Sequence, residues 1–321
     1  MKQDSSKEIL RVEDLRVYYT SVLGEYKVVD GVDFSVHKDE IFGVAGESGC
    51  GKSTLVEGIL RLVVPPGYIK SGRIFFNEKD LLALDEETLR KTRFKELAYI
   101  PQGSMNSLNP VMRVEDQISE TLKTHQKITK EEAKERVAEV LVAVGLPPET
   151  ARMYPHELSG GMKQRVCIAA AMTLNPSLII GDEPTTALDV SVQRVVLQSI
   201  KDVKEELKVT VLMISHDMAV HAELADRVAV MYAARLCEIA DVYTIFEEPM
   251  HPYVQLLVKC IPSLKRTELG GIMGMAPSPL MWPPGCRFHP RCPYAMPKCK
   301  TELPNMVEVE PDHFVSCHLV G

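Results

Sequence analysis

The octapeptide GESGCGKS, Gly46 to Ser53, decides the fold of this chain. It matches the phosphate-loop pattern G-x-x-x-x-G-K-[ST] at every position that the pattern fixes. It follows the short apolar run IFGVA at residues 41–45, which is typical of a buried strand, and it precedes a helical pattern over residues 52–62. A glycine-rich turn would match by chance in roughly one chain of this length in a hundred. The strand–loop–helix order therefore predicts an α/β protein with a phosphate-binding loop.

The residue types of this loop explain how it would hold a phosphate. Backbone N–H groups of such a loop point inward, and the dipole of the following helix favours an anion at the helix start. Lys52 is predicted to reach the β- and γ-phosphates of a nucleotide, and the Ser53 hydroxyl is predicted to bind Mg²⁺. The residues assigned to nucleotide binding are Gly46, Ser48, Gly49, Cys50, Gly51, Lys52, Ser53 and Thr54.

A second motif, LIIGDEP at Leu178 to Pro184, is an apolar strand pattern that ends in two carboxylates. Asp182 suits coordination of Mg²⁺ through water, and Glu183 is placed to polarise an attacking water as a general base. The alternative is a capped strand end, because acidic pairs are common after strands. In a chain that also carries GESGCGKS, we expect the functional role. Gly181 stands where an apolar residue is usual, and we expect it to leave the chemistry unchanged.

A third motif, LSGGMKQR at Leu158 to Arg165, places Ser159, Gly160 and Gly161 at a predicted helix start. Such a start is another anion-binding N-terminus. A simple helix cap is the alternative, and it would need the serine but not the two glycines. A chain with two phosphate-binding helix starts favours a dimer in which each nucleotide is held from both sides.

The composition narrows the class of protein. The chain has 321 residues, 45% hydrophobic and 25% charged, with a net charge of −7 and a pI near 5.8. A chain of this length and composition suits about two globular domains, and its negative net charge makes nucleic acid an unlikely main partner. We expect no secretory signal at the N-terminus and no membrane span, because no run of 18 apolar residues occurs. The eight cysteines are then expected in a reducing cytosol, where disulfides are rare.

The pattern along the chain predicts its domains. Strand patterns at residues 8–19 and 28–36 come first, and a charged helical stretch follows a polar loop within residues 104–157, which indicates an inserted helical subdomain. From Ser159 onward helices and strands alternate, as in a parallel α/β sheet. The segment 261–321 is rich in proline and glycine, so we expect a separate, irregular extension after a phosphate-loop domain at residues 1–260.

The extension carries four cysteines, Cys286, Cys292, Cys299 and Cys317, with five, six and seventeen residues between them. Structural zinc sites usually use tight C-x₂₋₄-C pairs, and none occurs here. A cubane iron–sulfur cluster accepts thiolates from wider loops, so a metal centre could staple the extension. The spacing leaves a cluster, a mixed Cys/His zinc site and unligated thiols open. Nearby histidines are His289, His313 and His318, and the cysteines expected to take no part are Cys50, Cys167, Cys237 and Cys260.

The order GESGCGKS, Gln102, LSGGMKQR, LIIGDEP, ALD and His216 resembles the ATPase subunit of an ATP-binding-cassette transporter, over residues 8 to about 250. The resemblance implies a cassette fold with a mainly parallel core sheet and an antiparallel N-terminal β subdomain, with ATP and Mg²⁺ as ligands. It also implies residue roles. Gln102 would touch Mg²⁺ and sense membrane subunits, His216 would contact the γ-phosphate and Asp189 would lie across a dimer. Tyr19 would stack on adenine, with Tyr18 as its rival.

Further stretches resemble the oligopeptide/dipeptide permease branch, namely MNSLNPVMRV, HPYVQLL and PPGCRFHPRCPYA. That resemblance implies an importer motor on the cytoplasmic face of the cell membrane. Its partners would be a second, related ATPase chain, two membrane-spanning permease subunits and an extracytoplasmic solute-binding protein. The solute would be a peptide, with oligosaccharide or metal as alternatives. Branch members with four tail cysteines hold iron–sulfur clusters, which implies a 4Fe–4S cluster here.

Other classes of protein fit the sequence less well. Cassette ATPases of translation or DNA repair usually carry two cassettes or a long coiled coil, whereas this chain has one GESGCGKS and an insert of about fifty residues. A redox-sensing module with a decayed ATPase is disfavoured because Lys52, Asp182, Glu183 and His216 are intact. An exporter motor is disfavoured by the extension. One departure from the cassette family is MYAARLCE, where the second alanine usually is glycine.

Overall fold

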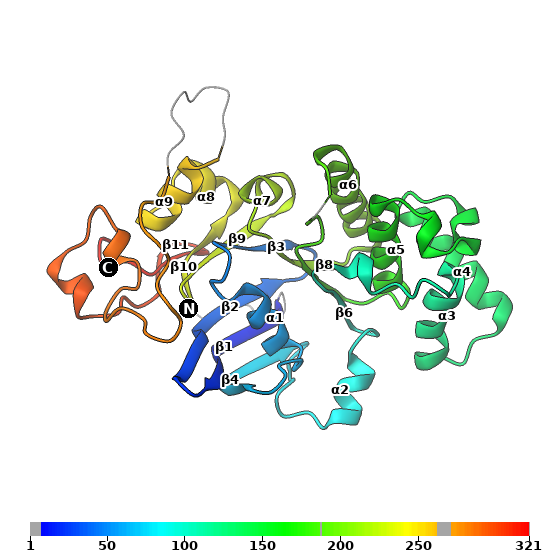
Figure 1. Ribbon diagram of the computed structural model, residues 1–321, viewed down its shortest axis with the longest axis horizontal. Coiled ribbons are helices and arrows are strands. Elements are labelled where there is room, and N and C mark those ends of the chain that lie inside the picture. Colours follow the sequence, from blue (N-terminus) through cyan, green and yellow to red (C-terminus); the bar gives the residue numbers. More distant parts are fainter. Residues whose placement is uncertain (1–7, 187, 262–270, 321) are drawn as a thin grey trace. The chain divides into compact units, whose positions relative to one another are not determined.

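The computed structural model describes residues 8–186, 188–261 and 271–320, and the chain divides into two compact units (Figure 1). The first unit draws on residues 1–36, 42–82 and 215–321. The second unit draws on residues 37–41 and 83–214. The phosphate loop and the cysteine-bearing extension thus belong to one unit, and the LSGGMKQR and LIIGDEP motifs belong to the other.

The first unit contains an antiparallel β layer near the N-terminus, as expected. Its strand order is β2-β1-β4-β5, and β1 pairs antiparallel with β4, which places Leu10 opposite Phe76. Residues of β1 alternate between buried and more exposed positions over much of its length, which is the period of a sheet with one covered face. The strands are β1 (Glu8–Ser21), β2 (Gly24–His37), β4 (Gly67–Phe76) and β5 (Lys79–Asp80).

The other strands of the first unit run in the order β11-β12-β10-β9-β3. Only the β3/β9 pair among them is parallel, and the pairs from β9 outward are antiparallel. The sheet is therefore mixed rather than mainly parallel on this side. The extension was expected to be irregular, yet it adds β12 to β10, with Val315 opposite Glu238. The strands are β3 (Ile41–Ala45), β9 (Arg227–Tyr232), β10 (Arg235–Asp241), β11 (Val307–Glu310) and β12 (His313–Val315).

The core of the first unit joins the cassette part to the extension. Aromatic rings from three segments meet there: Tyr232 lies 4.6 Å from Tyr253 and 5.2 Å from Phe288, ring centroid to centroid. Phe288 comes from the extension and is fully buried. The extension thus shares this core, although its proposed boundary at residue 261 stays a prediction. The helices of this unit include α1 (Lys52–Ile59), α7 (Met218–Leu224), α8 (Val242–Glu247), α9 (Pro252–Lys259), η4 (His289–Arg291) and η5 (Pro297–Lys300).

The second unit has parallel strands in the order β8-β7-β6, in which Ile179 lies opposite Val211 on one side and Ala98 on the other. All five residues of β7 are buried, as its continuous apolar run predicts for a parallel strand covered on both faces. The Thr129 side chain and Glu132 form a capping box that starts α4. The strands are β6 (Leu97–Ile100), β7 (Leu178–Asp182) and β8 (Thr210–Ile214).

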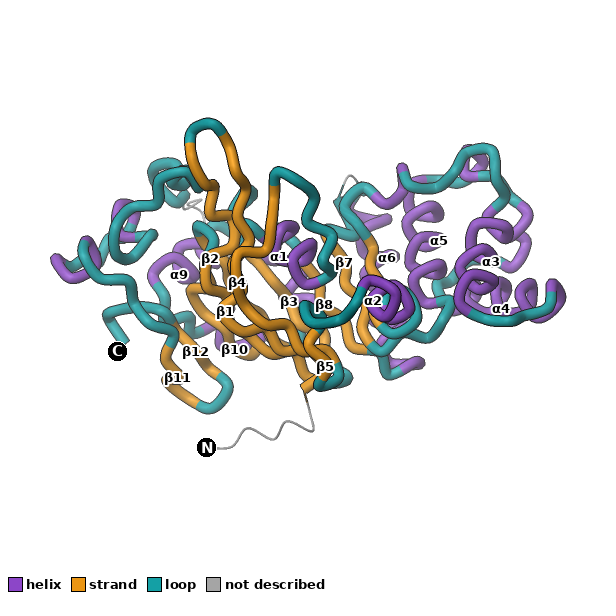
Figure 2. Tube along the Cα trace, turned by 90° about the horizontal axis from the view of Figure 1, so that it is seen from below, coloured by secondary structure: helices purple, strands orange, loops and turns teal. Residues whose placement is uncertain are grey.

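Helices form the rest of the second unit, where α3, α4 and α5 pack on one another (Figures 1 and 2). Residues 104–157 contain two of these helices, and the proposal of a separate subdomain there stays a prediction. Among the described residues, no helix has both the length and the apolar character needed to cross a bilayer. The helices are α2 (Glu86–Thr92), α3 (Val114–His125), α4 (Lys130–Ala143), α5 (Gly160–Met172), α6 (Val190–Leu207), η1 (Ser104–Asn106), η2 (Pro148–Arg152) and η3 (Pro155–Glu157).

Candidate functional site

The phosphate loop lies between β3 and α1 in the first unit. Its backbone turns through positive φ at Gly46 (148°), Gly49 (79°) and Gly51 (112°), a region that favours glycine. A Cβ atom at Gly46 would lie 2.1 Å from the Met231 carbonyl oxygen, and one at Gly51 would lie 2.2 Å from the Val28 carbonyl oxygen. Two glycines of the motif are therefore required by close packing, and no side chain caps the start of α1.

Lys52 folds back over this loop. Its ammonium donates to the Gly46 carbonyl at 2.8 Å and to the Glu47 carbonyl at 3.1 Å, and the side chain is buried. An ammonium group offers three hydrogen-bond donors, and this one lies at the loop that the motif assigns to phosphate binding. Cys50 is buried beside it, and burial raises the pKa of the Cys50 thiol, so this residue is a neutral packing group of the loop.

Residues outside the motif hold the loop in place, and sequence reasoning missed them. The backbone N–H of Glu47 donates to the Tyr253 hydroxyl at 3.1 Å. The Glu47 carboxylate accepts a hydrogen bond from Arg291 of the extension at 3.0 Å. The Ala234 N–H donates to the Cys50 carbonyl at 3.0 Å. No local pattern indicates these contacts, because the partners lie far from the loop in sequence.

His216 lies between β8 and α7, and its side chain is exposed. The preceding carbonyl, that of Ser215, lies 3.1 Å from Nε2 of His221. His221 is fully buried, and burial lowers its pKa to about 4, so its neutral ring donates to that carbonyl. A Cβ atom at Gly43 would lie 2.4 Å from the His221 ring, so this strand residue has to be small. His221 therefore supports the segment that carries His216.

The two candidate adenine-stacking tyrosines differ in exposure. Tyr18 is 5% exposed, and its hydroxyl donates to Asp30 at 2.6 Å. Tyr19 is partly exposed, and its hydroxyl donates to Glu57 of α1 at 3.2 Å. A ring held in the core offers no face for a base, so the geometry favours Tyr19 over its rival. Its adenine contact stays a prediction.

In the second unit three polar side chains meet at the end of β7. Gln102 and Glu183 were predicted from the sequence, and Thr186 is their neighbour. The Gln102 amide donates to the Glu183 carboxylate at 3.2 Å, and the Thr186 hydroxyl donates to the same carboxylate oxygen at 2.8 Å. Glu183 has a φ of 49°, which is unusual for a residue other than glycine and is typical of strained functional positions. Asp182, at the strand end, is 1% exposed. The pair predicted as base and Mg²⁺ ligand thus stands beside Gln102.

The LSGGMKQR motif begins α5, as predicted. The Ser159 hydroxyl accepts the Met162 N–H at 3.3 Å, which is an N-cap contact. Gly160 leaves room for a side chain, whereas a Cβ atom at Gly161 would lie 2.3 Å from Val192 of α6. Packing alone therefore explains one of the two glycines.

Asp189 caps α6 in a similar way. The Ser191 hydroxyl, with the Val192 N–H, lowers the pKa of the Asp189 carboxyl. Asp189 is therefore an ionised helix cap. Its role across a dimer stays a prediction, and the alanine of the predicted ALD stretch lies outside the described residues.

A buried contact, also missed from sequence, links the loop after Gln102 to α5. The Ser104 hydroxyl donates to the Gln164 side chain at 3.1 Å, and the Cys167 thiol contacts the Ser104 carbonyl at 3.3 Å. Burial raises the pKa of Cys167 to about 11, so this thiol is inert. The loop after Gln102 and the LSGGMKQR helix therefore form one hydrogen-bonded arrangement.

The four cysteines of the extension gather in the first unit. Burial, together with the neighbouring thiols of Cys299, Cys317 and Cys292, raises the pKa of Cys286 to about 11. Burial and neighbouring thiols likewise raise the pKa values of Cys292 and Cys317. The Cys286 N–H donates to the Cys299 carbonyl at 2.9 Å, and none of the eight cysteines forms a disulfide. The chain thus brings these four thiols near one another.

Within the described ranges, no three side chains of His, Cys, Asp or Glu are arranged to bind a metal ion. The predicted iron–sulfur or zinc ligand set is therefore not assembled in this fold. Ring nitrogens of the three nearby histidines have other partners: His289 contacts the Cys286 carbonyl at 2.8 Å, His313 contacts Glu238 at 2.8 Å and His318 contacts the Glu302 carbonyl at 2.9 Å. These contacts weigh against the mixed Cys/His alternative. Cys237, which was expected to take no part in a metal site, is buried near Cys286.

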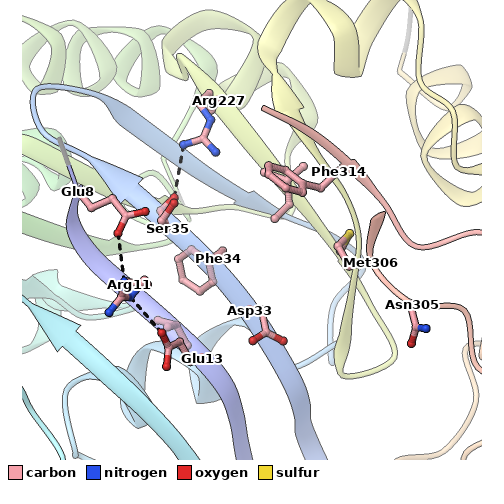
Figure 3. A pocket seen from close by; sticks show the side chains of 12 residues that line it. Glu8, Arg11, Glu13, Asp33, Phe34, Ser35, Arg227, Asn305, Met306 and Phe314 are labelled. Atoms are coloured by element: carbon pink, nitrogen blue, oxygen red, sulfur yellow. Dashed lines mark hydrogen bonds and ion pairs between the residues drawn. The ribbon is translucent and has the colours of Figure 1, made fainter. Parts of the chain in front are cut away.

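A separate pocket of about 460 Å³ lies in the first unit (Figure 3). Arg11 pairs there with Glu13 at 3.2 Å, and Arg227 donates to the Ser35 carbonyl at 3.4 Å. Phe34, from β2, and Phe314, from β12, add apolar surface to its wall. None of the residues that line it belongs to the nucleotide motifs, so this pocket is not the candidate site.

Comparisons with known proteins agree with this arrangement. An ABC transporter family model matches residues 29–186, and a model of the oligopeptide/dipeptide transporter C-terminal region matches residues 237–299. The chain is 44% identical to the dipeptide transport ATP-binding protein DppD of Caldanaerobacter subterraneus, with 97% of each chain covered. It is 42% identical to the oligopeptide transport ATP-binding protein AppF of Bacillus subtilis, with 99% of each chain covered.

Solved structures support the same fold. The dimeric structure of MJ0796, a bacterial ABC transporter cassette, is similar with a TM-score of 0.65 and 26% identity, over 73% of this chain and 98% of that one. A post-hydrolysis structure of the same cassette bound to ADP and phosphate gives a TM-score of 0.65 at 25% identity, over the same shares of the two chains. The predicted cassette fold is confirmed. The chain belongs to the ABC transporter family, in the oligopeptide/dipeptide branch of its ATP-binding subunits.

Proposed function

We propose that this protein is the ATP-hydrolysing motor subunit of an importer for oligopeptides or dipeptides. The observation that carries the proposal is the Glu183 carboxylate at the end of β7, held by Gln102 and Thr186. The phosphate loop with Lys52 supplies the nucleotide-binding site that such a motor needs. The named relatives that transport dipeptides and oligopeptides support a peptide as the solute.

In this proposal Glu183 accepts a proton from the attacking water. A general base must stay oriented toward the water, and the two hydrogen bonds from Gln102 and Thr186 hold the carboxylate in place. Lys52 neutralises charge on the β- and γ-phosphates, and His216 contacts the γ-phosphate. Ser53, Gln102 and Asp182 offer the oxygen donors that Mg²⁺ takes, and the ion would offset charge that develops on the phosphates.

The second part of the proposal is a dimer in which Ser159, Gly160 and Gly161 of one chain contact the nucleotide of another. The exposed start of α5 supports it, because Ser159 and Gly160 are both accessible there. Asp189 would lie at the same interface. The dimeric cassette similar to this chain adds support.

A Ser159→Arg variant tests this dimer. The bulky cation should leave ATP binding within about twofold of the wild type, because Ser159 takes no part in its own chain's phosphate loop, and it should abolish turnover. Lys163→Ala, in the same helix, is the matched control and should hydrolyse ATP normally. A strictly monomeric preparation that hydrolyses ATP at the full rate would contradict the dimer.

The partners follow from the same proposal. A second, related ATPase chain, two membrane-spanning permease subunits and an extracytoplasmic binding protein would complete the importer, with this chain peripheral on the cytoplasmic face. The loop after Gln102 is hydrogen-bonded to α5 through Ser104 and is therefore suited to relay a signal. Cysteine crosslinks from positions 105–110 of the intact complex should reach membrane subunits. Crosslinks to soluble proteins alone would contradict this arrangement.

A 4Fe–4S cluster held by Cys286, Cys292, Cys299 and Cys317 completes the proposal, with zinc as the alternative. The mutual effect of these thiols on their pKa values supports it, and the absence of an assembled ligand set in the described residues counts against it. Anaerobic purification with iron, sulfide and zinc analysis tests it. Four irons and four sulfides per chain are expected. One zinc without sulfide would leave only the alternative, and no metal would contradict both.

A further inference from the structure

Arg291 of the extension is a buried arginine that reaches the phosphate loop. Only 7% of its side chain is exposed. Its guanidinium donates to the Glu47 carboxylate at 3.0 Å, to the Tyr232 hydroxyl at 3.3 Å and to the carbonyls of Met273 (3.1 Å) and Ile272 (3.3 Å). All three nitrogens therefore have partners, and these partners come from three separate segments. The guanidinium is a rigid cross-link because its donors are fixed in one plane.

Glu47 is the second residue of GESGCGKS, and each of its polar groups is bound. Its N–H donates to the Tyr253 hydroxyl at 3.1 Å, its carbonyl accepts from Lys52 at 3.1 Å and its carboxylate accepts from Arg291. The peptide that accepts from Lys52 is thus fixed by a residue of α9 and a residue of the extension. A shift of Arg291 would move the carbonyl to which the phosphate-binding lysine is bonded.

We propose that Arg291 is a positioning residue for the phosphate loop, acting through Glu47, so that the fold of the extension sets the affinity for ATP. This inference rests on the proposed function, because it assigns the loop to ATP. A buried guanidinium needs an ionised partner, and Glu47 supplies one. Preorganised loops bind ligands more tightly because they have less freedom to lose on binding.

A second arginine of the extension strengthens the argument. Arg287, 9% exposed, donates to the Ala233 carbonyl at 2.6 Å and pairs with the Asp30 carboxylate. The next residue, Ala234, donates its N–H to the Cys50 carbonyl in the phosphate loop. Two arginines of the stretch CRFHPRC therefore support the loop, one directly and one through the β9–β10 turn.

The stretch between Cys286 and Cys292 is held in place by the extension itself. The Cys286 N–H donates to the Cys299 carbonyl, and a Cβ atom at Gly285 would lie 2.4 Å from that same carbonyl oxygen. The loop that carries Cys299 thus fixes the start of the stretch that carries Arg291. Any event that rearranges these cysteines would be transmitted to Glu47.

The test measures the dissociation constant of ATP by calorimetry, and KM and kcat for hydrolysis, on full-length variants. Arg291→Ala and Glu47→Gln should each weaken ATP binding by roughly tenfold and raise KM, with a smaller effect on kcat. The double variant should bind ATP no more weakly than the worse single variant, because both remove the same contact. Arg291→Lys should recover part of the affinity. Lys298→Ala, which removes an exposed ion pair with Glu302, is the matched control and should bind ATP normally.

The outcomes separate two failures. Wild-type affinity in both Arg291→Ala and Glu47→Gln would overturn the positioning role while leaving the proposed ATPase intact. Losses that multiply in the double variant would also overturn it, because Arg291 would then act by another route. A wild-type protein that binds no ATP would instead contradict the proposed function itself. If Arg291→Ala does not fold, Glu47→Gln, which keeps the shape of the side chain, carries the test.

Discussion

Glycines lie at or just before the start of both α1 and α5, yet the two helix starts are stabilised in opposite ways. At α1 the N-cap is Gly51, with a φ of 112° and no side-chain cap, and the loop before it is held by Tyr253, Arg291 and Ala234. At α5 the N-cap is Ser159, whose own hydroxyl accepts a backbone N–H, and the first residues are exposed. The start of α1 depends on residues far away in the sequence, whereas the start of α5 depends on its own N-cap residue.

This difference predicts which substitutions should affect each helix start. A loop fixed by distant contacts responds to substitutions that touch no ligand. A self-capped start should respond only to changes at the cap or at its exposed surface. The predictions below test this contrast, from the largest expected effect to the smallest.

Glu183→Gln should give the largest effect. The amide cannot accept a proton, so turnover should fall by about 10²–10⁴. Binding of ATP should remain within about twofold, because the phosphate loop keeps all its contacts. Single-turnover hydrolysis and equilibrium binding measure the two effects. Near-normal turnover would remove Glu183 from the role of general base.

Lys52→Ala should weaken ATP binding, which is the quantity that Glu183→Gln leaves nearly unchanged. Loss of a charge-assisted hydrogen bond costs about 1.5–3 kcal/mol, which corresponds to a dissociation constant roughly 10- to 150-fold higher. Isothermal titration checks this, with Lys163→Ala of α5 as the control. Equal losses in the two variants would break the contrast between the helix starts.

Acid should destabilise the strand that leads into the phosphate loop. Burial, aided by Lys52, lowers the pKa of His221 from 6.5 to about 4, whereas Ser215 and Asp217 act in the opposite direction. Between those values the unfolded chain binds a proton that the folded chain excludes, so stability falls as pH falls below 6.5. At pH 5 the loss should be about 2 kcal/mol.

Thermal unfolding of the wild type and of His221→Gln between pH 7 and pH 4.5 measures this effect. Glutamine keeps a donor for the Ser215 carbonyl but does not titrate, so its melting temperature should depend less on pH. Identical pH profiles for the two proteins would show that His221 is not the group responsible.

Ser159→Ala should cost about 1 kcal/mol of stability through the lost N-cap. Ser159→Gly should cost only a few tenths of a kcal/mol, because glycine is a tolerated cap. Denaturant unfolding distinguishes the two. A large loss in both variants would show that α5 depends on contacts beyond its own cap.

Ala234→Gly should produce the smallest change, and it should stabilise the fold. Ala233 and Ala234 have φ values of 47° and 69°, a left-handed conformation that costs a residue with a Cβ atom about 1–2 kcal/mol. Glycine removes that strain but adds freedom to the unfolded chain, which leaves a net gain of about 0.5 kcal/mol. A lower melting temperature for Ala234→Gly would contradict this account.

The cassette fold was implied by the family resemblance, whereas local patterns predicted an α/β fold, the phosphate loop and the strand that ends in Asp182 and Glu183. Each of these depends on residues adjacent in sequence, where periodicity and glycine spacing carry the information. Other features depend on contacts that no local pattern encodes. Arg291 and Glu47, for example, are 244 residues apart.

The extension was the least predictable region. Its strands are only four and three residues long, too short for a periodic signal, and they form by pairing with one another and with β10. Its cysteines converge, but spacing alone does not reveal whether four thiols reach the same ion. The site of the cluster therefore stays a proposal, whereas the shared core with Tyr232 and Tyr253 is a structural result.

The pairing of β12 with β10 also covers a sheet edge at which copies of the chain could otherwise pair strand to strand. Without β12, β10 would present unpaired backbone N–H and C=O groups at a sheet edge, where another copy could add a strand. The hairpin moves that edge outward to β11, whose exposed Glu308 and Glu310 carry charges that discourage edge-to-edge pairing (Figure 2). Chains that end before β12 should therefore precipitate during expression, whether or not their nucleotide site is intact.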